Sequence, residues 1–174
     1  ADGTYGAGSV IALTVKFSEA VLVTGAPTLM LETGATHRAA VYTGGSGTST
    51  LTFEYTVQDG DASLDLDYLG TTALALNGGT LRDAAGNDAV LTLAAPGATG
   101  SLAAGHAIVI DTVAPTVTAF TPADEAADVA PGSDIVLTFS EAVVKGTGNI
   151  VLKTAAGAVI ATYDAATSAN LTLS

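Results

Sequence analysis

The 174-residue sequence contains no cysteine and no tryptophan. The absence of cysteine excludes a disulfide framework and is compatible with secretion of a protein that folds without one. No apolar run reaches about 18 residues, so we predict no membrane-spanning helix, and we recognise no signal peptide.

Basic residues are also scarce. Five Lys and Arg stand against 17 Asp and Glu, which gives a net charge of −12. Binding to nucleic acids or insertion at anionic membranes needs clusters of Lys and Arg, so this composition argues against both. The acidic surface instead suits a medium rich in cations. Because 48 % of the residues are hydrophobic, a packed core is still expected.

Few residues point to catalysis. Paired carboxylates can hydrolyse glycosides, but only 5 % of the residues are aromatic, too few for the usual sugar platforms. His37 and His106 lie at the edges of predicted strands, and His37 beside Arg38 is expected to be exposed. The glycine-rich segment 43–48 joins two strands without leading into a helix, unlike a phosphate loop. We predict no enzyme activity and no cofactor-binding residues.

Short alternating segments rich in β-branched residues dominate the chain, separated by turns rich in Gly, Asn and Asp. No segment keeps a helical period over three turns. The segments expected to be strands are residues 9–17, 27–33, 38–43, 49–57, 72–76, 89–94 and 106–111. Many short strands with regular turns predict an all-β fold made of antiparallel β-sandwiches.

The sequence also repeats itself. "VKFSEAV" at 15–21 recurs as "LTFSEAV" at 137–143, and each copy follows an apolar strand that opens with Gly-Ser. Pro115 interrupts the pairing pattern between the copies, so we predict two domains, 1–112 and 113–174. Compared with the second unit, the first lacks a counterpart of "APTVTAFTP" (114–122) and is expected to miss its first strand. The second is expected to be the N-terminal part of a repeat.

The motifs "FSEAV", "DAAGN" and "IDTVAPTV" resemble the bacterial immunoglobulin-like repeats of large surface and secreted adhesins. The segment "FTPADEAADVAPGSDIVLTFSEAV" (120–143) is similar to the SbsA-type Ig-like domain of that group. The resemblance covers nearly the whole chain. It implies tandem Ig-like β-sandwiches, the second incomplete, in an extracellular stalk that is often stiffened by calcium.

Acidic residues gather in "DGDASLDLDY" (59–68), where like charges would repel each other. On an Ig-like topology this loop shares one pole of the first unit with the N-terminal loop and the end of residues 106–111. The pole would face Glu141 of the second unit. Because calcium prefers six to eight oxygen ligands, we predict a calcium site at the junction. Its predicted ligands are Asp2, Asp65, Asp67, Asp111 and Glu141. The alternative is that these loops are merely solvated.

A weaker metal site is predicted at the other pole of the first unit. Glu19 is expected to open a loop there, close to the "DAAGND" loop with Asp83, Asn87 and Asp88. The alternative is that this loop binds no metal, because Asp and Asn followed by Gly commonly form turns.

These observations predict a structural module: an extender in the stalk of a bacterial cell-surface or secreted adhesin, stiffened by calcium. Two other functions stay open, a module that binds a glycan or a partner protein, and an accessory domain of a secreted enzyme. The expected partners are neighbouring repeats. A missing strand also leaves a sheet edge that can recruit another chain, and residues 115–121 of a second molecule could enter that edge of the first unit.

Overall fold

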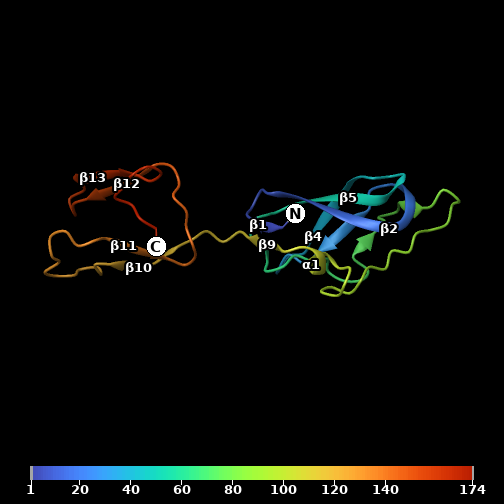
Figure 1. The fold of residues 1–174 in the computed structure, drawn as a ribbon, viewed down its shortest axis with the longest axis horizontal. Coiled ribbons are helices and arrows are strands. Elements are labelled where there is room, and N and C mark those ends of the chain that lie inside the picture. The colour runs from blue at the N-terminus through green and yellow to red at the C-terminus, as the bar shows by residue number, and fades with distance from the viewer. Residues whose placement is uncertain (1, 174) are drawn as a thin grey trace. The chain divides into compact units, whose positions relative to one another are not determined.

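The computed structural model describes residues 2–173, so Ala1 and Ser174, which end the two predicted domains, lie outside the described residues. The chain forms two compact units, Ala1–Val113 and Ala114–Ser174 (Figure 1). Nearly all regular structure is β, in curled antiparallel sheets, which confirms the predicted all-β, Ig-like fold class. No helix among the described residues is long and apolar enough to cross a membrane.

The first unit is built on a six-stranded sheet of antiparallel strands in the order β7-β3-β4-β5-β2-β8. The strands are β2 (Val10–Thr24), β3 (Thr28–Leu31), β4 (Arg38–Gly44), β5 (Thr48–Thr56), β7 (Leu74–Ala75) and β8 (Thr80–Arg82). The sheet places the predicted strands 9–17, 27–33, 38–43 and 49–57 side by side.

A second, three-stranded sheet has the order β1-β9-β6, with β1 (Gly3–Tyr5), β6 (Ala62–Ser63) and β9 (Ile108–Asp111). Strand β1 pairs in parallel with β9. This differs from the expectation that the first unit lacks an N-terminal strand. The glycine-rich start hides β1, because three residues are too short to show an alternating pattern.

The core lies on one face of the six-stranded sheet and follows the alternation of the strands. Ile11 and Leu13 of β2 are buried, whereas the alternate residues Ala12 and Thr14 are exposed. On β5, Leu51, Phe53 and Tyr55 are buried in the same way. From the second sheet, Ile108 and Ile110 complete the core. Alternate side chains of a strand point to opposite faces, so the period of two alone selects these inward positions.

The first FSEAV copy does not begin a loop, contrary to the expectation for Glu19. Strand β2 runs through it to Thr24, with an irregular register against β5 between Lys16 and Val21. Beyond this irregularity β2 pairs with β8. The motif therefore bends a long strand, as a β-bulge does, and lets it exchange one partner strand for another.

The segment between β8 and β9 also differs from expectation. Residues 89–94 form no strand, although Leu91 and Leu93 are half-buried against the core. A short helix, α1 (Leu102–Gly105), follows, and the Ser101 side chain accepts a hydrogen bond from the Ala104 N–H at its start. The alternation of apolar residues in 89–94 thus reflects contact of their side chains with the core, not pairing of the segment in a sheet.

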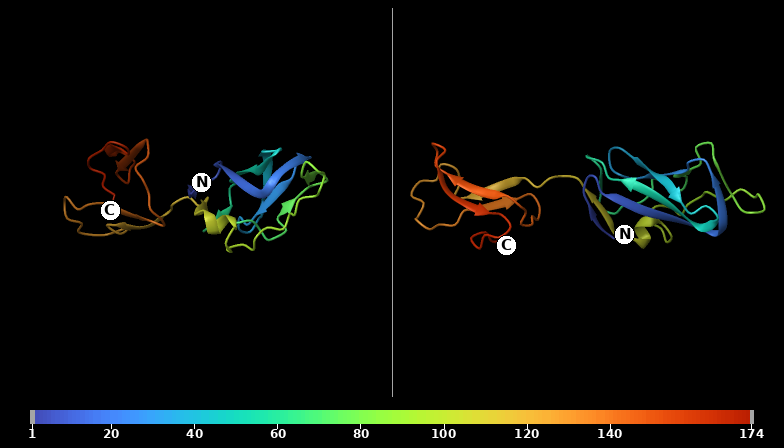
Figure 2. Two further views of the ribbon diagram at one scale, coloured as in Figure 1. Left: turned by 45° about the vertical axis from the view of Figure 1, so that its right-hand side comes forward. Right: turned by 90° about the horizontal axis from the view of Figure 1, so that it is seen from above.

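The second unit contains two separate pairs of strands. Strand β10 (Val117–Thr121) pairs with β11 (Val136–Phe139), and β12 (Asn149–Lys153) pairs with β13 (Val159–Asp164), all antiparallel (Figure 2). Among residues 114–173 no side chain is fully buried. The two hairpins therefore share no closed core, in contrast to the first unit.

Candidate functional site

Asp61 is the most deeply buried charged residue in the acidic loop, with no exposed surface. Its carboxylate accepts hydrogen bonds from Arg38 Nε at 2.8 Å, from the Tyr55 hydroxyl at 2.7 Å and from the Gln58 N–H at 2.9 Å. Arg38 lies on β4 and Tyr55 on β5, so the carboxylate joins two strands to the loop that follows them. Arg38 is 23 positions away in the sequence, and pairing of β4 with β5 brings it close.

Burial and hydrogen bonding act in opposite directions on Asp61. Burial alone would raise the pKa of its carboxyl, but the donors Tyr55, Arg38 and Gln58 outweigh it and hold the pKa below the usual value. Burial, followed by the hydrogen bond to Asp61, raises the pKa of the Tyr55 phenol. Both groups are therefore fixed in the hydrogen-bonded state at neutral pH, Asp61 charged and Tyr55 neutral, as a structural tie requires.

Asp67 is buried to 7 % exposure and is bound by backbone donors. Its Oδ1 accepts from the N–H groups of Tyr68 at 2.8 Å and Leu102 at 3.2 Å, and its Oδ2 accepts from the Gly97 N–H at 3.0 Å. The neighbouring Tyr68 hydroxyl donates to the Ala94 carbonyl at 2.7 Å. These bonds anchor the irregular segment 94–102 to the acidic loop.

The other predicted junction ligands lie apart from this anchor. Oδ1 of Asp2 is 3.1 Å from Nδ1 of His106, a contact that lowers the Asp2 pKa, and it also accepts from the Ala107 N–H at 3.2 Å. Asp65 is exposed, and Asp111 at the end of β9 accepts from the Val113 N–H at 3.0 Å. Glu141 is half-buried and belongs to the second unit.

Across residues 2–173 no three His, Asp or Glu side chains gather as a metal-binding group. The first unit therefore does not bring Asp2, Asp65, Asp67 and Asp111 together as one such group. The junction site also needs Glu141 of the other unit, and it stays a prediction.

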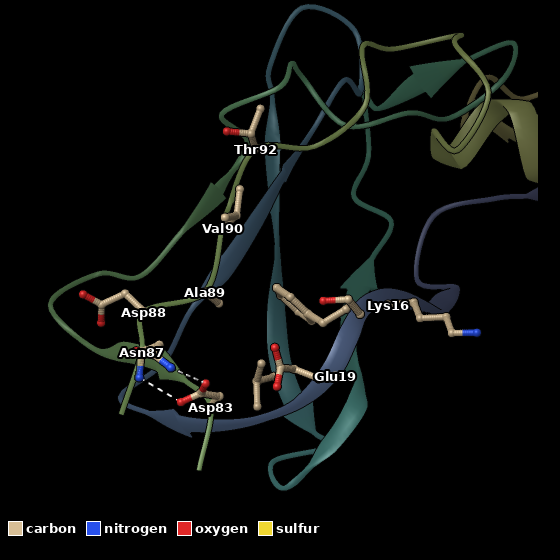
Figure 3. A pocket seen from close by; sticks show the side chains of 11 residues that line it. Lys16, Glu19, Asp83, Asn87, Asp88, Ala89, Val90 and Thr92 are labelled. Atoms are coloured by element: carbon tan, nitrogen blue, oxygen red, sulfur yellow. Dashed lines mark hydrogen bonds between the residues drawn. The ribbon is translucent and has the colours of Figure 1, made fainter. Parts of the chain in front are cut away.

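The four residues of the weaker predicted metal site do line one hollow, of about 340 Å³ (Figure 3). Two of its three carboxylates are already engaged. Asp83 accepts from the Asn87 N–H at 2.8 Å and from Asn87 Nδ2 at 2.7 Å, which lowers the Asp83 pKa, and Asp88 pairs with Arg82 at 2.6 Å. Glu19 is exposed on the bent part of β2. The Asp83–Asn87 bonds close a turn, as the alternative interpretation of this loop predicts.

The comparisons with known proteins bear on the second unit. Residues 111–174 match the family model of the bacterial Ig-like domain. No curated protein and no solved structure gave a match. Domains of this family are typically non-catalytic modules of bacterial surface proteins. This segment is therefore similar to a bacterial Ig-like domain, a kind of module found in bacterial surface proteins.

Replacement of Arg38 by methionine should leave the Asp61 charge buried without its cationic partner. We expect Arg38→Met to lower the free energy of unfolding by about 2–3 kcal/mol, measured by chemical denaturation. The matched control is Arg82→Met, which breaks the exposed pair with Asp88 and should cost at most about 1 kcal/mol. Equal effects of the two substitutions would contradict a structural role for the buried pair.

The stability that Asp61 contributes should depend on pH. Because its pKa is lower in the folded state, its contribution is complete above the unfolded pKa of about 3.9 and declines as the pH falls below that value. Asp61→Asn should therefore be less stable than the wild type at neutral pH, and the difference should narrow in acid. Denaturation of both proteins between neutral and acidic pH measures this, and a constant difference would refute it.

Asp67→Asn separates anchoring from metal binding. If Asp67 serves the segment 94–102, the substitution should lower the melting temperature equally in excess calcium and in chelator, because one carboxylate oxygen becomes an amide donor facing N–H groups. Exposed Asp65→Asn is the control and should have little effect in either condition. A loss of stability that occurs only in calcium would instead identify Asp67 as a ligand.

Proposed function

We propose that this chain is a structural spacer in the stalk of a bacterial cell-surface or secreted adhesin, located outside the cell. The observation that carries the proposal is the repeat of FSEAV on equivalent strands of two units. The first copy lies within β2 and the second begins at Phe139, the last residue of β11. The second copy lies inside the segment that matches the bacterial Ig-like family. A repeated β module, one copy of which is similar to a domain of bacterial surface proteins, suits a stalk.

The surface of the chain supports the same proposal. The net charge of −12 keeps such modules from associating non-specifically with each other or with anionic surfaces. The charged groups of the first unit with the deepest burial, Asp61 and Asp67, bind donors of their own chain rather than facing an open cleft. Their hydrogen bonds therefore support rigidity of the module rather than chemistry on a substrate.

Calcium stiffening at the 111–115 junction is a separate part of the proposal. It is supported by the excess of acidic residues and by the exposure of Asp65, and it is weakened by the internal partners of Asp67 and Asp2. The spacer role does not require it. The melting comparison in calcium and chelator bears on calcium alone.

A replacement experiment tests the spacer role. In the surface protein that carries this chain, residues 1–174 would be exchanged for an unrelated pair of β-sandwich domains of similar length, or for a flexible Gly/Ser linker of equal residue number. A spacer predicts that adhesion survives the rigid exchange and weakens with the flexible linker, whose mean end-to-end distance is far shorter than its contour. Loss of adhesion with the rigid exchange would instead favour a module that binds a glycan or protein itself.

A further inference from the structure

Strand β2 is paired on one side only over most of its length. From Val10 to Lys16 its partner is β5, and on the opposite side β8 pairs only with Leu22–Thr24. Alternate residues of an antiparallel strand direct their N–H and C=O groups to opposite sides, so about half of those between Val10 and Lys16 face away from β5. Along that edge no strand of the described residues pairs with β2.

This edge borders a hollow. Residues 12–16 form one side of a cavity of about 530 Å³, and its other side is formed within residues 92–106. The hollow of about 340 Å³ around Glu19 lies next to it along β2, because Lys16 and Thr92 line both cavities. We call these two neighbouring hollows, between residues 12–21 of β2 and residues 87–106, the β2 groove. Figure 3 shows part of its outer wall, where Ala89, Val90 and Thr92 follow one another.

The β2 groove has a partly apolar lining and a fixed outer wall. Half-buried Val15 and Leu93 line it, together with the buried core residues Leu13 and Leu29. The wall is held by the bonds of Asp67 to residues 97 and 102 and of Tyr68 to residue 94. The groove is therefore formed before anything enters it, which reduces the ordering cost of binding.

The internal repeat indicates what fits beside this edge. When the two FSEAV copies are aligned, Phe17 corresponds to Phe139, and β11 corresponds to residues 14–17 of β2. In the second unit this strand has a partner that β2 lacks, namely β10, with Phe120 opposite Leu137. The equivalent of Leu137 is Val15, which lines the β2 groove.

Strand β10 is only loosely packed in its own unit, so it can separate from β11. Val117 and Phe120 are about half exposed, at 48 % and 50 %, and no residue of its unit within 114–173 is fully buried. The segment 113–123 carries no charged residue. Two copies that each carry a net charge of −12 repel each other, so an uncharged strand is the part of one copy that can approach another closely.

We propose that the β2 groove binds β10 of a second copy of this chain as an added antiparallel strand. The backbone of residues 117–121 hydrogen-bonds to the free edge of β2, and the side chain of Phe120 lies next to Val15. Main-chain bonds give such strand addition its affinity, and alternate side chains give it specificity. The result is lateral linkage between copies, a property that a spacer role does not require.

A peptide tests the proposal on the full-length chain. A fluorescent peptide of residues 114–122, APTVTAFTP, is titrated with the protein, and its anisotropy is measured. We expect saturable binding, which a scrambled peptide and a peptide with Phe120→Asp do not show. These peptide controls do not depend on the folding of any protein variant.

A protein variant locates the binding site. Thr92→Trp places a large side chain at an exposed position that lines both halves of the β2 groove, and should abolish peptide binding. Thr72→Trp, at an exposed position that lines neither half, should bind the peptide as the wild type does. Sedimentation velocity should show dimers of the wild type that excess peptide dissociates. The proposal is overturned if the native peptide does not bind, if it binds no better than the scrambled one, or if folded Thr92→Trp still binds it.

Discussion

The arrangement of the first unit depends on one buried carboxylate. Asp61 is bound by Arg38 of β4, by Tyr55 of β5 and by the backbone of Gln58, while its own carbonyl accepts from the Thr112 hydroxyl just beyond β9. Both sheets are therefore tied at one end of the unit through a single residue. A buried charge is tolerated only where donors replace the water that it has lost. The requirement fixes where the chain must turn after β5, and so where the acidic loop lies.

The same tie explains how four aspartates occur within nine residues. Asp61 and Asp67 point into the protein and are bound by separate sets of donors, whereas Asp59 and Asp65 are exposed to solvent. Repulsion is relieved because the buried pair is compensated inside the fold and the exposed pair is hydrated. A cation shared by all four is not needed to explain the spacing. Each buried aspartate instead anchors a different segment, Asp61 the strands β4 and β5, and Asp67 the irregular chain ahead of α1.

The sequence carries enough information for the strands that alternate over several residues, such as β2 and β5, because burial on one face imposes a period of two. It carries too little for β1, which has three residues, and it is misleading for residues 89–94, where apolar contact with the core imitates a strand. One feature of the sequence indicates the Arg38–Asp61 pair in part. Arg38 shares a strand face with buried Ala40, and a cation on an inward face requires an acidic partner. The identity of that partner depends on how a loop folds back, which no local pattern records.

Comparison of the two FSEAV copies shows which structural features depend on the motif and which depend on neighbouring strands. In the first unit the motif bends a long strand that is covered by β5 and then by β8, and Ile11, Leu13 and Val21 of that strand are buried. In the second unit the motif begins at the last residue of β11, which pairs with β10 alone, and Val136 and Leu137 stay about half exposed. Regular pairing is interrupted at the first copy and ends at the second, so the local irregularity belongs to the motif. The core does not belong to it, because burial of the strand depends on the strands β3 to β5 that pack beside it. The same motif can therefore occur in a unit with a closed core and in a unit without one. Which neighbouring strands are present decides whether the sheet edge beside the motif is open.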